Sequence, residues 1–276
     1  MTILISGATG NVGRPLVEQL LRAGHRVRAL TRNPTTASLP EGVELFKGNL
    51  SDTASLKDAF DGVSAAHLIS FGDDYAPLDN GGDIAALATA AGVRKVTILK
   101  GDLDKTGLDQ AIEAAESIEH TFLAPVEFMS NTLEWADGIR ENGEVREPFV
   151  ESKSAMIHDA DIAAVAAAVL TGTGHSGRTY WLTGPEALDV RQKVAVLSEV
   201  LRRDIRLVEQ TQDEVVAQWR EQGYSEEDIE FFVMMRTNTP EAGHTPQPTV
   251  REVTGRPARA YAEWVHENAE VFGGIG

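Results

Sequence analysis

The chain contains no cysteine among its 276 residues. This absence excludes disulfides, thiolate metal sites and cysteine nucleophiles, and it fits the reducing cytoplasm, where we expect the protein to act. Long apolar runs are also missing, because the alanine-rich segment 162–170 is far shorter than the roughly 20 residues that span a bilayer. Arg14 and Glu18 interrupt the apolar start of the chain, so no secretory signal is predicted.

Positive charge is scarce, with 25 Lys and Arg against 42 Asp and Glu and a formal net charge of −17. A negative field of this size repels nucleic acids and anionic membranes, so neither is an expected partner. We expect a small-molecule substrate and no metal site, and a homo-oligomer remains open. The length allows one large domain, or a main domain with a smaller one.

The strongest motif is a glycine turn near the N-terminus. Residues 3–5 form an uncharged apolar run, as in a strand buried on both faces. Three glycines follow at a spacing of three, and residues 14–23 then carry the apolar stripe of a helix. Strand, turn and helix in this order favour a dinucleotide-binding unit over a plain turn, because helix N-terminal N–H groups bind phosphate. The predicted phosphate-side residues are Gly7, Thr9, Gly10, Asn11, Val12 and Gly13.

The sequence of this turn, GATGNVG, resembles that of the short-chain dehydrogenase/reductase superfamily, and within it that of the atypical NmrA-like branch. Members of that branch bind NADP(H) or NAD(H). The resemblance continues through later blocks and covers essentially the whole chain. These blocks are Phe128-Met129-x-Asn131, residues 157–166, Leu182-Thr183-Gly184-Pro185-Glu186 and Thr254-Gly255-Arg256-Pro257.

The end of the second predicted strand, residues 25–31, indicates the cofactor. NAD-preferring enzymes carry an acidic residue there, which binds the ribose 2′-hydroxyl. This chain has Thr31, Arg32 and Asn33 and no carboxylate. Arg32 could pair with a 2′-phosphate, and Arg14 is a second candidate, whereas a solvated loop arginine is the alternative. We therefore expect NADP(H) to be preferred over NAD(H).

Two further strand ends complete the predicted cofactor site. The third strand, 43–50, ends in Asn49 and Leu50, where related proteins contact the adenine. The fourth strand, 65–71, ends in Ile69, Ser70 and Phe71, which should pass under the cofactor where the strand order reverses. His67 lies inside this apolar strand and is interpreted as a core histidine rather than a catalytic one.

Members of the superfamily with typical catalysis place a serine after the fifth strand and Tyr-x-x-x-Lys on the next helix. Here the residues four positions after the tyrosines are Asp79, Gly184, Asp228 and Val265, so this proton donor is absent. Lys100 follows the fifth strand, 93–99, in the serine position. It could contact a nicotinamide ribose or a substrate carbonyl, or lie in solvent. The candidate catalytic residues are Lys100, His158 and Asn131.

Seven short strands alternating with helices predict an α/β fold, a doubly wound parallel sheet of the Rossmann type. The dinucleotide-binding domain is expected to comprise residues 1–128 and about 153–186. A smaller, mostly helical substrate-side domain would comprise about 129–152 and 187–276. Its residues Phe231, Phe232, Met234 and Met235 could line an apolar pocket, although a position in the domain core is favoured.

These observations favour an NADPH-dependent oxidoreductase that transfers a hydride to a small carbonyl, quinone or related apolar acceptor. The alternative is a non-catalytic NADP(H) sensor or regulator that acts through a protein partner, as some relatives do. Loss of the Tyr-x-x-x-Lys pair supports the sensor, and the second domain with its apolar helix supports the enzyme.

Overall fold

The computed structural model describes residues 1–72, 76–101 and 104–274, so Tyr75 and part of the predicted loop 72–82 lie outside the described residues. The chain divides into two units. The first comprises Met1–Pro125, Asp159–Leu182 and Thr249–Arg256, and the second comprises Val126–His158, Thr183–Pro248 and Pro257–Gly276. No helix in the described part of the chain has both the length and the apolar character needed to cross a membrane.

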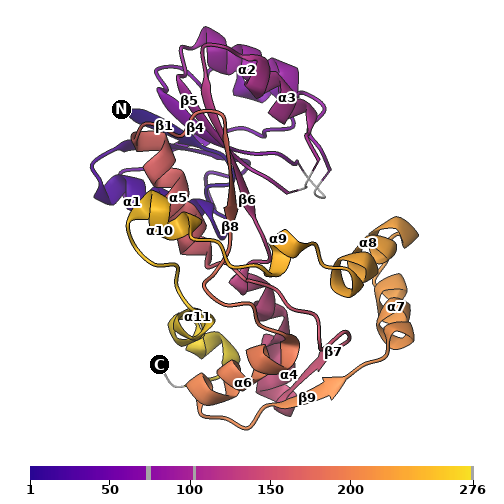
Figure 1. Cartoon of the computed structure of the whole chain (residues 1–276). Helices are drawn as coiled ribbons and strands as arrows, with labels where there is room; N and C mark the ends of the chain where they lie inside the picture. The colour runs from indigo at the N-terminus through magenta and orange to yellow at the C-terminus, as the bar shows by residue number, and fades with distance from the viewer. Residues whose placement is uncertain (73–75, 102–103, 275–276) are drawn as a thin grey trace. The chain divides into compact units, whose positions relative to one another are not determined.

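The first unit is built on a parallel sheet in the order β3-β2-β1-β4-β5-β6-β8 (Figure 1). This arrangement confirms the predicted Rossmann-type sheet. The order reverses between β1 and β4, the place where open α/β sheets bind their ligands. The strands are β1 (Thr2–Ile5), β2 (Arg26–Thr31), β3 (Glu44–Lys47), β4 (Ala65–Ile69), β5 (Lys95–Leu99), β6 (Glu119–Pro125) and β8 (Arg178–Leu182).

Helices cover both faces of this sheet (Figure 1). One face carries α1 (Gly13–Arg22), α5 (Asp159–Thr171) and the short α10 (Thr249–Thr254), which the sequence did not predict. The other face carries α2 (Gly81–Ala90), α3 (Gly107–Ala114) and the 3₁₀ turn η1 (Thr53–Leu56). Because α5 is buried along most of its length, its alanine-rich sequence is that of a core helix.

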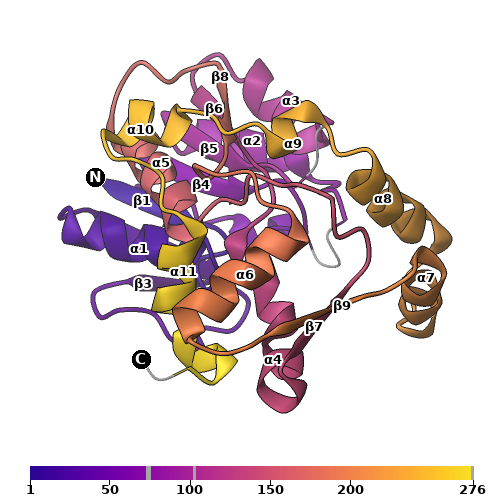
Figure 2. The ribbon, with the colours of Figure 1, turned by 60° about the horizontal axis from the view of Figure 1, so that its bottom comes forward.

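The second unit has its own apolar core, which includes Ile139, Leu197 and Val265. Helices α6 (Val190–Leu201) and α11 (Tyr261–Glu267) lie side by side in it (Figure 2). A two-stranded parallel ladder, β7 (Glu144–Glu147) with β9 (Arg206–Glu209), was not predicted. Its remaining elements are η3 (Met129–Trp135), α4 (Ala136–Asn142), α7 (Gln212–Glu221), α8 (Glu226–Thr237), α9 (Glu241–His244) and η4 (Ala269–Phe272).

Three helices of the second unit begin at the polar residues that their sequences offer as caps. Asp189, Thr211 and Ser225 each cap a helix, with a side-chain oxygen that accepts from the backbone N–H three residues on. Two other segments differ from what their sequences indicate. The three prolines of segment 237–249 indicate a loop, but it contains α9, and segment 259–272 has the apolar stripe of one helix but is divided between α11 and η4.

Helices α7 and α8 pack against each other as a hairpin (Figure 2). Val215 and Ile229 are buried in it, whereas other apolar residues of the hairpin are exposed. Phe231 is 53% exposed and Met234 is 43% exposed, so the expectation that they belong to the core was wrong. Phe232 and Met235 are half-buried, and the Phe232 ring lies 5.4 Å from that of Trp219. The hairpin is therefore held by its own aromatic contacts.

His67 lies in the core of the first unit, as predicted. It is 1% exposed, and its Nδ1 lies 2.8 Å from the hydroxyl of Thr97, its neighbour on β5. Burial lowers the pKa of His67 from 6.5 to about 4, because the charged ring would lose its hydration. The ring is consequently neutral at physiological pH.

The buried histidine predicts a pH-dependent stability. Because its folded-state pKa is below its unfolded-state value, the unfolded chain takes up a proton first as the pH falls. Stability is therefore complete above pH 6.5 and is lost between pH 6.5 and about 4, by on the order of 3 kcal/mol at the low end. Urea unfolding of wild type and His67→Gln across this range measures the effect. The exposed His266→Gln serves as the control, and equal pH slopes in all three proteins would contradict the assignment.

Candidate functional site

The site begins at the glycine turn between β1 and α1. Gly7 has a φ of +61°, which side chains rarely adopt, and its carbonyl accepts from the N–H of Gly10 at 2.9 Å. Gly13 packs so tightly that a Cβ there would lie 2.0 Å from the Gly7 carbonyl oxygen. The absence of a side chain at Gly13 thus lets α1 begin directly against the end of β1.

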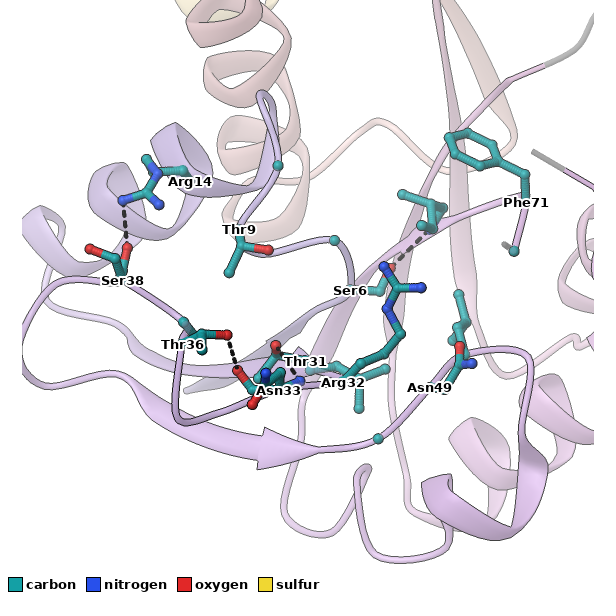
Figure 3. Close-up of a pocket in the computed structure, with 18 residues that line it drawn as sticks. Ser6, Thr9, Arg14, Thr31, Arg32, Asn33, Thr36, Ser38, Asn49 and Phe71 are labelled. Carbon is teal, nitrogen blue, oxygen red and sulfur yellow. Dashed lines mark hydrogen bonds between the residues drawn. The ribbon is translucent and has the colours of Figure 1, made fainter. Parts of the chain in front are cut away.

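A hollow of about 870 Å³ opens above this turn (Figure 3). The ends of β1, β2, β3 and β4 all contribute to it, so it lies where the strand order reverses. Its lining includes many residues predicted to bind the cofactor, namely Gly7, Thr9, Gly10, Thr31, Arg32, Asn49, Leu50, Ile69 and Phe71.

The other predicted cofactor residues lie elsewhere. Val12 and Gly13 are buried beneath the turn, whereas Asn11 is exposed. Ser70 is 1% exposed, and its hydroxyl accepts from the N–H of Gly101 at 3.1 Å. Lys100 does not line the hollow either. These residues support the walls of the hollow from behind or lie outside it.

One rim of the hollow is a loop that sequence reasoning missed. Asn33, Thr36 and Ser38 line the space, and Arg14 Nη1 donates to the Ser38 carbonyl at 2.5 Å. Figure 3 shows this contact at one end and Arg32 reaching from the end of β2 toward the middle. The hydroxyl-rich sequence after Pro34 was the available signal.

The charge of the hollow is of one sign. Arg14 and Arg32 line it, and among its described lining residues there is no Asp or Glu. A concave surface with guanidinium groups, hydroxyls and a helix N-terminus is suited to phosphate groups. In a chain of net charge −17, this is a local reversal of the overall field.

Lys100 is held by an internal ion pair. Its ammonium group pairs with the carboxylate of Asp109, donates to the Asp104 carbonyl at 2.6 Å, and lies 5.9 Å from the ring centroid of Phe122. The Lys100 side chain is 9% exposed and that of Asp109 is fully buried. Of the two alternatives left open for Lys100, a strand-end lysine in solvent is therefore wrong. A lysine that contacts a ligand would have to give up this ion pair.

The other two candidate catalytic residues belong to the second unit. His158 is 5% exposed, and its Nε2 lies 3.1 Å from a carboxylate oxygen of Glu267. Asn131 is exposed on η3, where its N–H donates to the Phe128 carbonyl. Within the described ranges, no group of three His, Asp or Glu residues could hold a metal ion.

A charged cluster that sequence reasoning missed also belongs to the second unit. Lys193 is 4% exposed, and its ammonium group donates to Glu127 at 2.8 Å. Burial would raise the pKa of Glu127, but Lys193 and the hydroxyl of Ser154 hold it below its ordinary value. Glu127 therefore stays ionised two residues after the end of β6.

The pKa values of two nearby carboxyl groups, Glu134 and Glu147, are raised instead of lowered. Desolvation and the nearby Glu147 raise the pKa of Glu134 to about 7, although the residue as a whole is exposed. Burial likewise raises the pKa of Glu147, which accepts from the indole N–H of Trp135 at 2.6 Å.

Comparison with known proteins places this geometry in context. A model of the NmrA-like family matches residues 1–242. The chain is 38% identical over 287 residues to a (4-alkanoyl-5-oxo-2,5-dihydrofuran-3-yl)methyl phosphate reductase of Streptomyces griseus, covering 98% of this chain and 99% of that protein. It is 32% identical over 295 residues to the NAD(P)H azoreductase of Xenophilus azovorans, covering 98% and 99%.

Among solved structures, the chain resembles an NADPH-dependent quinone oxidoreductase of Escherichia coli in complex with NADPH. The TM-score is 0.78 at 25% identity, over 97% of this chain and 99% of that one.

The packing at Gly13 generates a direct test of the turn. Gly13→Ala should push the Gly7–Ala8 backbone away from α1, lowering the melting temperature and weakening NADPH binding by about tenfold or more. Calorimetry with NADPH measures the loss. Gly82→Ala is the matched control, because nothing lies within 4 Å of a Cβ at that helical position. An unchanged affinity in Gly13→Ala would mean that the turn does not shape the binding site.

Proposed function

The chain belongs to the NmrA-like family, and from this premise we propose that it is an NADPH-dependent oxidoreductase acting on a small, electron-poor conjugated acceptor. The observation that carries the proposal is the hollow at the switch point of the sheet, which is lined by arginines and hydroxyls and by no described carboxylate.

The residues of the hollow fit a dinucleotide. The close approach of Gly13 to Gly7 leaves a backbone surface on which a pyrophosphate can rest without meeting a side chain. The N-terminus of α1 supplies a partial positive charge. When bound, the dihydronicotinamide of such a cofactor supplies a hydride from its C4.

Preference for NADP(H) follows from charge. A carboxylate at the end of β2 would bind a ribose 2′-hydroxyl and repel a 2′-phosphate. Thr31, Arg32 and Asn33 stand there instead, and Arg14 contacts Ser38 of the loop that follows them. We assign the 2′-phosphate to Arg32 in the first place, and the loop that follows it adds Thr36 and Ser38 to the lining.

The relatives suggest the chemistry of the acceptor. Their names specify an oxo-dihydrofuran, an azo compound and a quinone. Each is a conjugated, electron-poor π system, which accepts a hydride at one atom and spreads the negative charge over several others. Such acceptors need less help from a dedicated acid than a simple ketone does, which agrees with the missing Tyr-x-x-x-Lys pair.

A proton must still reach the reduced acceptor. We propose His158 and Asn131 as the groups that donate or relay it, with water as the remaining source. Lys100 was the third candidate from the sequence, but its ammonium is already paired with Asp109.

The cofactor preference is tested at Arg32. Removing one charge-assisted contact costs about 1.5–3 kcal/mol, so Arg32→Ala should weaken NADPH binding by about ten- to a hundredfold and leave NADH binding nearly unchanged. Calorimetry with both cofactors checks this. Arg26→Ala, which removes an exposed arginine from the start of β2, should leave both affinities unchanged. Wild type that binds NADPH and NADH equally would refute the preference.

Catalysis itself is tested by turnover. Wild type should oxidise NADPH in the presence of a panel of quinones, azo dyes and unsaturated lactones, with the reduced acceptor formed in equal amount. Absorbance at the dihydronicotinamide band follows the reaction. If NADPH binds but no acceptor is reduced, the better assignment is the non-catalytic NADP(H) sensor that acts through a protein partner.

A further inference from the structure

Phe71 closes the end of the hollow that lies away from Arg14 and Ser38 (Figure 3). It follows β4, on the β4–β5 side of the point where the strand order reverses. Arg32 and Asn49 lie at the ends of β2 and β3, on the other side, where a dinucleotide places its adenosine half. The space beside Phe71 is therefore the place for the nicotinamide half.

Gly101 packs directly against the Phe71 ring. A Cβ at position 101 would lie 2.5 Å from Cδ1 and 2.8 Å from Cε1 of that ring, which is closer than real Cβ contacts. The N–H of Gly101 donates to the hydroxyl of Ser70, the residue before Phe71. The backbone after β5 thus sets the position of the ring from behind.

The residue before Gly101 is anchored on the other side. The side-chain ammonium of Lys100 pairs with Asp109. The backbone N–H of Lys100 donates to the Leu123 carbonyl of β6 at 2.8 Å. The same Asp109 carboxylate accepts from the N–H of Thr106 and so completes the capping box of α3. Its other oxygen is buried without a hydrogen-bond partner among the described residues.

We propose that Lys100, Asp109 and Gly101 are positioning residues that hold Phe71 as the wall for the nicotinamide half of the cofactor. This inference rests on the proposed function, because it presumes that the hollow binds NADPH. It gives Lys100 a role different from that of an electrostatic catalyst. The Lys100 ammonium is paired with the carboxylate of Asp109, which is fully buried and has no access to solvent. Moving the lysine away would leave the Asp109 charge buried without a partner.

The first test separates the two halves of the cofactor. Gly101→Ala must displace the Phe71 ring, so it should weaken NADPH binding by about tenfold while changing the affinity for 2′,5′-ADP, which lacks the nicotinamide half, less than about twofold. Thermal melts establish that the variant is folded. The effect should disappear in a Phe71→Leu background, because the smaller side chain relieves the contact. Equal losses for both ligands, or additive effects of the two substitutions, would overturn the proposal.

The second test removes the anchor. Lys100→Met should destabilise the protein and weaken NADPH binding but not 2′,5′-ADP binding, since Asp109 is left unpaired. Adding Asp109→Leu should restore most of the NADPH affinity, because an apolar pair can replace a buried ion pair. A lysine that touched the nicotinamide itself would not be rescued in this way, and that result would refute the positioning role.

The two ligands also distinguish this inference from the function on which it rests. If wild type binds neither NADPH nor 2′,5′-ADP, the cofactor assignment fails, and the inference fails with it. If wild type binds both and Gly101→Ala binds both equally well, only the inference is lost.

Discussion

The contact on which the site depends is the one between Gly13 and the carbonyl of Gly7. With only 2.0 Å available for a Cβ, the start of α1 can approach the end of β1 solely because position 13 has no side chain. That approach sets the height of the helix N-terminus above the sheet. Thr9 and Gly10 then lie on the floor of the hollow, and Arg14 is brought within reach of Ser38. The absence of a Cβ at Gly13 thus determines both the packing of α1 against β1 and the shape of the surface proposed to bind phosphate.

Much of the first unit could be predicted because its strands are buried on both faces and appear as short apolar runs. Elements were missed where that signal is absent. The β7 segment is four residues long with a single apolar member, and its partner β9 lies some sixty residues on. Prolines in the loop 237–249 argued against helices, yet Pro240 and Pro248 stand immediately before α9 and α10, where a helix tolerates proline.

The candidate site likewise contains residues that the sequence predicts and contacts that it does not. Residues whose place follows from strand ends, such as Arg32 and Asn49, were found, because open parallel sheets present those ends to the ligand. The partner of Lys100 could not be found from the sequence. Asp109 reads as an ordinary acid in the first turn of an amphipathic helix, and only the folded chain shows that it is fully buried against the lysine. Pairings across elements depend on packing, which local pattern does not record.

The ion pairs bear on what kind of acceptor the protein can serve. Lys100 and Lys193 are both nearly buried and both committed to a carboxylate, so neither can turn toward a developing oxyanion without leaving that carboxylate uncompensated. A simple ketone concentrates its new charge on one oxygen and would need such a cation or a tyrosine. A quinone or unsaturated lactone spreads the charge through its own π system. The absence of the Tyr-x-x-x-Lys pair and the pairing of both lysines therefore support the proposed class of acceptor for one physical reason.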